Sequence, residues 1–354
     1  MTDLLAINVI PTTQSRLAST NFSNLSFGHV FSDHMFTADF EDGAWKNLQI
    51  IPYGNIEISP AASSLHYGQA IFEGIKAYKQ PDGKVAIFRP QKNFERFNIS
   101  AQRMAMPAVP EAIFMQGMEK LIKLDSAWVP SGEGHSLYIR PLLFATDPIL
   151  GVHAATNYKF VILTGPAGAY YPKPLKVKIE MHYARAIEGG VGYAKTAGNY
   201  AGSLLPTKLA QNEGYDQLIW TDAKEHAYIE ESGTTNVMFV VNDTLITPST
   251  RDTILDGVTR HSILDLARAW GMKVEERRVS VAEIIEAAKN GTLQDAFGAG
   301  TAATIAHIAE ITYQGETYTL PAPENRVFSN KALHTLKEIR YGLSPDEFGW
   351  NRIL

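Results

Sequence analysis

The residues best suited to chemistry gather in three glycine-containing segments. The first, GGVGYAKTAGNYAG at 189–202, surrounds Lys195 with small or apolar residues. Glycine lets the backbone approach a ligand closely. A lysine amine drawn out of water has a lowered pKa, so it can attack a carbonyl as a neutral amine. The alternative interpretation of the same pattern is a solvated lysine on a flexible loop.

The other two segments are LDGVTRHS at 255–262 and FGAGTAATIAHI at 297–308, and each joins a glycine turn to a threonine and a helical pattern. A helix N-terminus binds anions, because its first N–H groups lack helical partners and its dipole adds positive charge. Thr259 and Thr301 would add hydroxyl donors. The pair predicts a phosphate cradle, although each segment alone also fits an ordinary helix cap. Neither matches the P-loop pattern, which disfavours a nucleoside triphosphatase.

Charged residues elsewhere give weaker patterns. Glu230 and Glu231 end a predicted strand, and Arg96 lies in a helical pattern from which it can clamp a phosphate. All three also fit solvated surface positions. The histidines are scattered without an HExxH-like spacing, and the chain has no cysteine, so we expect no metal site, disulfide or thiolate nucleophile.

The composition is that of an ordinary soluble protein. Of 354 residues, 45% are hydrophobic and 19% are charged, and the net charge of −5 argues against a nucleic-acid partner. No basic region precedes the short apolar stretch at the N-terminus, so we expect no signal peptide. No apolar run approaches the roughly 18 residues that cross a bilayer. A cytoplasmic protein without a membrane partner is therefore expected.

The elements that must position these residues are strands and helices in irregular order, which favours an α+β architecture in two domains. Strands are predicted within 27–58 and in VAIFRP, SLYIRPLLFAT, YKFVILTGPAG, KVKIEMHYARA, DQLIWTD, AYIEE, NVMFVVND and TLITPS; helices are predicted at 91–103, 111–124, 203–213, 259–270 and from the capping box at Ser280 and Glu283 to Gly291. Residues 69–78 fit a strand or a short helix. The Gly- and Pro-rich stretch 165–174 is the best linker candidate, so we predict domains at 1–165 and 175–354 joined by a linker at 166–174.

A set of ordered motifs carries a family resemblance from residue 27 to beyond 310. They are HYGQAIFEGIKAY, IFRPQKNFERF, LYIRP, GPAGAYY, GYAKTAGNY, EESGTTNV, DGVTR and FGAGTA. In this order they resemble the branched-chain aminotransferases, which have the fold type IV (D-amino-acid aminotransferase-like) architecture of pyridoxal-phosphate enzymes. The resemblance, and not the spacing, implies pyridoxal 5'-phosphate as cofactor. It implies amino transfer from L-leucine, L-isoleucine and L-valine to 2-oxoglutarate, giving branched-chain 2-oxo acids and L-glutamate.

The resemblance also implies residue roles. Lys195 would hold the cofactor covalently, Tyr200 would hydrogen-bond its phenolic oxygen, and Glu231 would pair with its pyridine nitrogen. Arg96 would bind its phosphate together with Val258, Thr259 and Thr301, and Thr234 joins the implied cofactor-binding residues. The substrate side would comprise Tyr67, Phe72, Tyr138, Arg140, Tyr170, Thr301 and Ala302. Leu150 and Val152 match a loop that reaches into the partner subunit's pocket in the family, so a homodimer is implied.

Alternatives of the same fold stay open. A D-amino-acid aminotransferase would share Lys195 and the phosphate cradle, and an aminodeoxychorismate-type lyase would eliminate pyruvate but usually has a shorter chain. HYGQAIFEGIKAY and LYIRP favour the branched-chain group. A non-enzymatic module that binds a phosphate ligand is disfavoured, because it would not need Lys195. Some relatives carry C-x-x-C after the G-T-A motif; here Ala303 and Ala306 stand there, so thiol redox control at that place is not expected.

Overall fold

The chain forms two compact units in a computed structural model that describes residues 4–168 and 173–354. The first unit comprises Met1–Ala169, Ala194–Ala197 and Glu338–Leu354; the second comprises Tyr170–Tyr193 and Gly198–Lys337. The domain division expected from the sequence, 1–165 and 175–354, assigned the C-terminal segment to the second domain, whereas its contacts group it with the first unit. Pro166 and Ala167, expected in the linker, lie in a strand.

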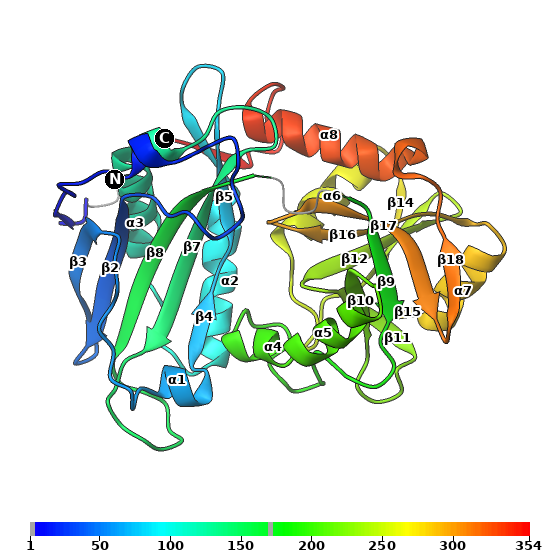
Figure 1. The fold of residues 1–354 in the computed structure, drawn as a ribbon, viewed down its shortest axis with the longest axis horizontal. Helices are drawn as coiled ribbons and strands as arrows, with labels where there is room; N and C mark the ends of the chain where they lie inside the picture. The colour runs from blue at the N-terminus through cyan, green and yellow to red at the C-terminus, as the bar shows by residue number, and fades with distance from the viewer. Residues whose placement is uncertain (1–3, 169–172) are drawn as a thin grey trace. The chain divides into compact units, whose positions relative to one another are not determined.

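The first unit is built on a nine-stranded sheet (Figure 1). Its strand order is β1 (Asn8–Val9), β3 (Ala44–Pro52), β2 (His34–Glu41), β8 (Tyr158–Ala167), β7 (Ser136–Ala145), β5 (Ile75–Lys79), β6 (Val85–Phe88) and β19 (Asn351–Ile353), with β4 (Ala70–Phe72) beside β7. All neighbours are antiparallel except β1 and β3. The ambiguous stretch 69–78 therefore forms strands.

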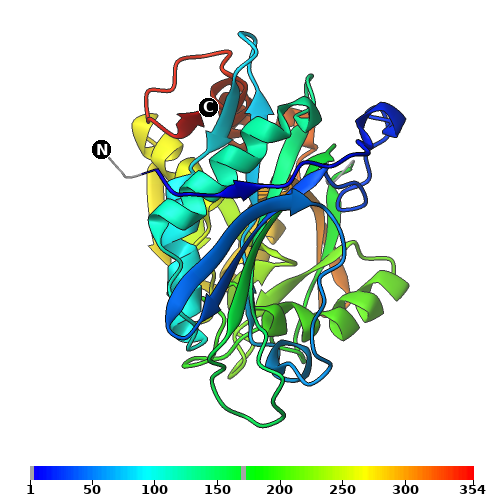
Figure 2. The same cartoon turned by 90° about the vertical axis from the view of Figure 1, so that its left-hand side faces the viewer.

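Two helices cover one face of this sheet. They are α2 (Pro90–Arg103) and α3 (Glu111–Leu124), and they confirm the helices predicted at 91–103 and 111–124. Phe97 and Phe114 bury their rings against Phe160 of β8, with ring centroids 5.6 and 5.8 Å apart. Strands β1 to β3 (blue) face the viewer in Figure 2. The remaining helical turns of this unit are α1 (Ser63–Tyr67) and the 3-10 turns Leu17–Ser19 and Ser126–Trp128.

The second unit is built on a ten-stranded sheet that closes into a small barrel. The order is β14 (Lys273–Arg277), β13 (Thr244–Pro248), β12 (Thr235–Val241), β16 (Leu293–Gly300), β17 (Thr304–Tyr313), β9 (Leu175–Ile179), β10 (Gln217–Thr221), β11 (Tyr228–Ser232) and β15 (Val279–Ser280), with β18 (Glu316–Thr319) beside β17. Because β11 also pairs with β12, the strands from β12 to β11 form a closed ring. Closure removes the exposed edges of these strands.

Helices complete the second unit and its boundaries. They are α4 (Ala197–Ala201), α5 (Leu204–Asn212), α6 (Val258–Ala269), α7 (Val281–Lys289) and α8 (Val327–Tyr341), with a 3-10 turn at Pro323–Asn325. The unit boundaries fall within α4 and α8. The predicted capping box is confirmed, because the Glu283 N–H donates to Ser280 Oγ at 3.0 Å.

The helix expected after Thr301 is wrong, because β16 and β17 form an antiparallel pair joined by a turn at this place. The residues of β17, TIAHIAEITY, are rich in β-branched side chains, which suit a pleated surface. The apolar residues of this segment also fit helical spacing. The segment is a strand because it pairs with β16, with Phe297 opposite His307 and Ala299 opposite Ile305.

Candidate active site

Lys195 lies in a short segment that is fixed to β4 within the first unit. Its backbone N–H donates to Ser100 Oγ at 2.8 Å, and its carbonyl accepts from the N–H of Phe72 at 3.0 Å. The next residue, Thr196, donates its hydroxyl to the carbonyl of Ala70 at 2.9 Å. The Lys195 Nζ lies 4.9 Å from the centre of the Phe72 ring. The backbone is thus fixed on both sides of the lysine, and the amine lies against an aromatic face.

Arg96 is buried on α2, where it is paired with a residue that the sequence analysis missed. Its Nε and Nη2 each donate to one oxygen of Glu73 at 2.7 Å. Asn93 Nδ2 donates to the same carboxylate at 2.7 Å. Burial raises the pKa of the Glu73 carboxyl, but the Arg96 charge and these hydrogen bonds outweigh it, so the pKa lies below its ordinary value. A lone acid within the apolar run AIFEGI was the signal, because a buried charge needs a partner.

The predicted substrate-side residues Phe72, Tyr138 and Arg140 contact one another. Arg140 Nη2 donates to the Tyr138 hydroxyl at 2.8 Å, and the guanidinium lies 4.6 Å from the centre of the Phe72 ring. Arg140 Nε is buried without a hydrogen-bond partner in residues 4–168 and 173–354. Gly74 makes room for this arrangement, since a Cβ there would stand 2.3 Å from the Tyr138 hydroxyl oxygen. The group presents two aromatic rings and one cation.

Two further residues, neither of them predicted as a site residue from the sequence, lie beside this group. The ring of Phe27 meets the ring of Tyr138 edge-on, with centroids 4.7 Å apart. Lys76 is the direct neighbour of Tyr138 across the β5–β7 pair. Burial, and then the positive charge of Arg340, lower the pKa of the Lys76 amine to about 7. Phe27 stands in a stretch that was considered only as strand-rich.

The other first-unit residues of the prediction lie at the surface. Tyr67 ends α1 and is half-exposed. Leu150 and Val152, in the loop between β7 and β8, are 66% and 88% exposed. The structure therefore groups Lys195 with the aromatic residues and leaves these three on the outside of the chain. Tyr170 lies outside the described residues.

In the second unit, Glu231 is buried on β11 and has two identified partners. The N–H of Leu255 donates to its Oε1 at 2.8 Å, and Arg185 Nη2 lies 3.3 Å from the same oxygen. Arg185 was also missed; its Nη2 further donates to the carbonyls of Gly192 and Thr253. An arginine in the stretch HYARA after a strand gave little signal, since arginines are mostly exposed.

The predicted helix N-terminus in LDGVTRHS is confirmed, because α6 begins at Val258 and buries both Val258 and Thr259. Gly257 precedes it, and a Cβ there would stand only 1.9 Å from Asn236 Oδ1. Asn236 Nδ2 in turn donates to the carbonyl of Leu255 at 2.8 Å. The start of α6 is therefore seated directly on β12.

Thr301 and Ala302 lie in the turn between β16 and β17, close to the same end of β12. A Cβ on Gly298 would meet Thr235 Oγ1 at 2.4 Å, and one on Gly300 would meet Thr235 Cγ2 at 2.9 Å. Thr235 and Asn236 thus lie between the two glycine segments that were expected to form one cradle. Thr234, the preceding residue, is exposed, and Tyr200 lies in α4.

Taken separately, the two units each hold groups that suit part of a cofactor with a phosphate and a basic ring nitrogen. Backbone that no Cβ can occupy, a helix N-terminus and a buried carboxylate are available in the second unit, and a lysine amine and an arginine are available in the first. Throughout the part of the chain that the structure describes, no three His, Asp or Glu side chains are grouped to hold a metal ion. Nor does that part contain a helix long and apolar enough to cross a membrane.

Comparison with known proteins defines the class first. Residues 70–311 match the model of the amino-transferase class IV family, so this chain is a class IV aminotransferase. It belongs to the branched-chain aminotransferases within that class, because it is 44% identical over 332 residues to branched-chain-amino-acid aminotransferase 2 of Bacillus subtilis (strain 168). That alignment covers 93% of this chain and 92% of the relative. A probable branched-chain-amino-acid aminotransferase of Staphylococcus aureus (strain N315) is 46% identical over 339 residues, which cover 94% of each chain.

Solved structures confirm the fold. The branched-chain aminotransferase of Thermoproteus uzoniensis, solved with norvaline, aligns with a TM-score of 0.74 at 24% identity and covers 90% of this chain and 99% of that one. The enzyme of Thermobaculum terrenum in its PLP-form gives 0.72 at 24% identity, covering 92% and 99%. The predicted α+β, fold type IV architecture is therefore confirmed.

Proposed function

We propose that this chain reversibly transfers the amino group of L-leucine, L-isoleucine or L-valine to 2-oxoglutarate, with pyridoxal 5'-phosphate as cofactor. The observation that carries the proposal is the fixed Lys195 segment, which holds the Nζ 4.9 Å from the Phe72 ring centre in a chain of this family. A lysine amine of this kind is the group that binds the aldehyde of the cofactor.

Lys195 has two tasks in this proposal. The bound cofactor supplies an electron sink for the pair left behind when the substrate loses its α-proton. Lys195 would hold the cofactor by its amine, and the same amine in its neutral form would accept the α-proton and return it to a neighbouring carbon. The hydrogen bonds from Lys195 to Ser100 and from Phe72 to Lys195 keep that amine in reach by fixing the backbone.

Glu231 and the phosphate-binding residues keep the cofactor oriented. A carboxylate held by Arg185 and by the Leu255 N–H favours a protonated ring nitrogen, because opposite charges attract. The N-terminus of α6 at Val258 and Thr259, together with Thr301, suits a phosphate. Arg96 adds charge, and Glu73 fixes the orientation of its guanidinium. Tyr200 and Thr234 complete the proposed cofactor-binding residues.

The substrate side combines an apolar surface with a cation. The rings of Phe72, Tyr138 and Phe27 suit a branched aliphatic side chain. One methylene group changes the binding free energy of a substrate by only about 1–3 kcal/mol, so leucine, isoleucine and valine are all substrates. The guanidinium of Arg140, whose Nε is buried, suits the second carboxylate of glutamate, whose charge needs a partner out of water. Tyr67, Tyr170, Thr301 and Ala302 complete this proposed side, with Leu150 and Val152 supplied by the partner of a homodimer. A cytoplasmic location is part of the proposal.

The test is the visible absorption spectrum of the purified protein with pyridoxal 5'-phosphate. We expect L-leucine to remove the band of the lysine-bound cofactor and 2-oxoglutarate to restore it, and we expect Lys195→Ala to lack the band while its circular dichroism is unchanged. A response to D-alanine but not to L-leucine would indicate a D-amino-acid aminotransferase. Pyruvate release without a keto-acid acceptor would indicate a lyase, and the absence of any bound cofactor would reject the proposal.

A further inference from the structure

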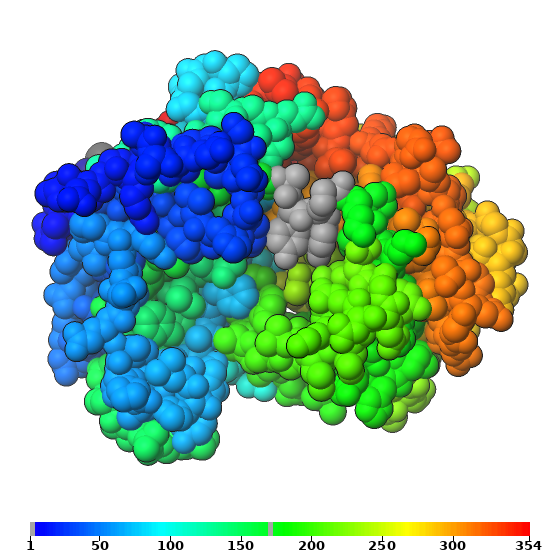
Figure 3. All heavy atoms as spheres, viewed as in Figure 1, coloured from blue at the N-terminus to red at the C-terminus, as the bar shows by residue number. Residues whose placement is uncertain are grey.

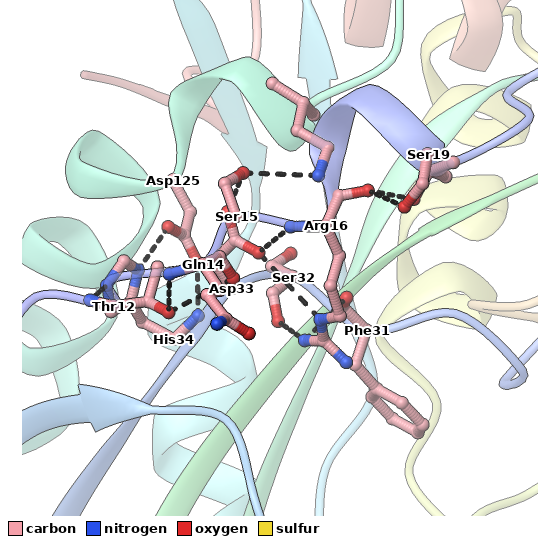
Figure 4. Close-up of polar contacts among 12 residues, drawn as sticks. Thr12, Gln14, Ser15, Arg16, Ser19, Phe31, Ser32, Asp33, His34 and Asp125 are labelled. Carbon is pink, nitrogen blue, oxygen red and sulfur yellow. Dashed lines mark hydrogen bonds and ion pairs between the residues drawn. The ribbon is translucent and has the colours of Figure 1, made fainter.

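The carboxylate of Asp33 joins the two ends of an N-terminal strap, residues 12–33 (Figure 4). Ser15 Oγ donates to Asp33 Oδ2 at 2.5 Å, and the N–H of Arg16 donates to Oδ1 at 2.9 Å. The Arg16 guanidinium donates in turn to the carbonyls of Phe31 and Ser32, at 3.2 and 2.6 Å. Burial raises the pKa of Asp33, but the hydrogen bonds from Arg16 and Ser15 outweigh it and keep the carboxyl ionised. One side chain thus joins the two ends of the strap.

His34 supplies a second tie at the same place. Its Nε2 accepts the N–H of Thr12 at 2.9 Å, so the ring proton is on Nδ1, which donates to Asp125 Oδ1 at 2.6 Å. The backbone N–H of His34 donates to the other oxygen of Asp125 at 2.9 Å. The start of the strap is therefore bound to the start of β2. Figure 3 shows the N-terminal segment (dark blue) at the surface of this unit.

The end of the strap packs closely on β8. The N–H of Ser32 donates to the carbonyl of Thr164 at 2.8 Å. The carbonyl of Val30 lies so close to Gly165 that a Cβ there would approach its oxygen to 2.2 Å. A glycine at 165 is therefore required for the strap to lie in this position.

Between these ties the strap brings Phe27 to the substrate-side residues. The Phe27 ring meets Tyr138 edge-on at 4.7 Å. A hollow of about 30 Å³ is lined by Gly28, Val30 and Phe31 from the strap and by Tyr138 and Arg140 from β7. The strap therefore forms a wall beside the residues proposed to bind substrate. The bonds at its two ends fix the position of this wall.

We propose that Asp33 is a positioning residue for the reaction: through Ser15 and Arg16 it fixes the strap, and the strap holds Phe27 against Tyr138. This inference rests on the proposed function of the Tyr138 and Arg140 side. Asp33 touches no reacting group, so its effect reaches the substrate through the strap alone. A purely structural Asp33 would instead contribute to stability without any effect on substrate binding.

The substitution Asp33→Asn tests this difference. An amide keeps one acceptor oxygen but removes the carboxylate's charge, so the bonds to both Ser15 and Arg16 are weakened. For the holoenzyme we expect KM for L-leucine to rise about tenfold while kcat changes less than about twofold. The preference for L-leucine over the smaller L-alanine falls at the same time, because the aromatic wall no longer stays in place. Ser15→Ala, which removes a single tie, produces a smaller shift in the same direction.

Asp39→Asn is the matched control, since Asp39 lies on β2, the strand that directly follows Asp33, but contacts Asn47 and Lys159 and not the strap. It leaves KM and substrate preference unchanged. An equal loss of thermal stability in the two Asn variants, with KM unchanged in both, would overturn the proposal.

Amide hydrogen exchange provides a readout that does not need turnover. The Ser32 N–H, bonded to Thr164, exchanges faster in Asp33→Asn and at the wild-type rate in Asp39→Asn. Unchanged exchange at Ser32 in both Asp33→Asn and Ser15→Ala would contradict the proposed tie, even if the wild-type protein had no transaminase activity. Absence of wild-type activity with faster exchange at Ser32 would reject the proposed function and leave the tie to the strap intact.

Discussion

Glu73 holds the guanidinium of Arg96 by two parallel hydrogen bonds of 2.7 Å in a site where Glu73 is fully buried. Such a fork-to-fork pair fixes both the place and the plane of the arginine. Glu73 and Arg96 are far apart in the sequence, so the pair forms only when α2 packs beside β4.

The substitution Glu73→Gln leaves Arg96 as a buried cation without its counter-charge. Breaking a buried ion pair from one side costs about 3–5 kcal/mol, so we expect a loss of that order in the free energy of unfolding. We also expect weaker binding of pyridoxal 5'-phosphate, because Arg96 is no longer held in one orientation. Urea unfolding of the cofactor-free protein and a cofactor titration measure the two effects.

Glu95→Gln is the control for this prediction. Glu95 lies on the same helix, α2, and its exposed carboxylate bonds to Lys92 at 2.8 Å. An exposed pair of this kind contributes less than about 1 kcal/mol, so stability and cofactor affinity remain near the wild-type values. Equal effects of the two substitutions would mean that the buried pair has no special role.

The carboxyl of Glu230 should make the free energy of unfolding depend on pH. Burial raises the pKa of its carboxyl from 4.5 to about 7, and the Thr253 hydrogen bond and the Arg185 charge offset only part of this. The folded state therefore favours the protonated form. Stability is lost as the pH rises from about 4.5 to about 7, by roughly 3 kcal/mol in total. Above about pH 7 the contribution of Glu230 to the free energy of unfolding is constant.

The variant Glu230→Gln cannot ionise and escapes this loss. Its stability relative to wild type should increase between pH 5 and pH 7 and then level off. Thermal unfolding at a series of pH values in one ionic strength measures the difference. A difference that is the same at pH 5 and pH 8 would contradict the raised pKa.

Gly257→Ala should weaken cofactor binding more than it weakens the fold. The added Cβ would stand 1.9 Å from Asn236 Oδ1, so Asn236 or the start of α6 must move. Asn236 donates to the carbonyl of Leu255, whose N–H donates to Glu231, so the disturbance reaches the carboxylate proposed at the ring nitrogen. Gly54→Ala is the control, because nothing lies within 4 Å of its Cβ. A Gly257→Ala protein that retains its cofactor through dialysis as wild type does would disprove this prediction.

We expect the exposed loop between β7 and β8 to contribute to the substrate site of the other subunit in the proposed homodimer. Val152 is 88% exposed, an unusual position for a side chain of this type. We expect Val152→Asp to raise KM for L-leucine and to leave the cofactor band unchanged. Hybrid dimers of Val152→Asp and Lys195→Ala subunits would then show a site with the wild-type KM, which neither parent has, since one site receives an intact lysine and an intact loop. No recovery of the wild-type KM in purified hybrids would place the loop outside the partner's site.

The sequence predicted those features whose signal is local. The hairpin turn between β2 and β3 has such a local signal in Asp42-Gly43, residue types that favour the positive φ of 52° and 76° that they adopt. The cap at Ser280 and the start of α6 at Val258 also have local signals. The C-terminal helix α8 had its own signal, with Ala332, Leu336 and Ile339 buried at helical spacing, but no element was predicted there.

What could not be predicted depends on partners that are distant along the chain. Glu73 and Arg185 are identified by their contacts with Arg96 and Glu231, and no local pattern specifies those contacts. Phe27 contacts Tyr138 only because the strap folds back across β8. The strand at 304–313 was mistaken for a helix because cross-strand pairing, not local spacing, determines it.

The position of β19 has a consequence for synthesis on the ribosome. All four residues of β6 are buried, and its outer neighbour β19 pairs Ile353 with Ala86 and Asn351 with Phe88. Translation delivers β6 early and β19 only after every residue of the second unit. A growing chain therefore carries an unpaired apolar strand edge throughout that interval, which is the kind of edge that recruits other chains. The sheet of the first unit is completed only when β19 has been synthesised, and protection of the β6 edge by chaperones matters most before that point.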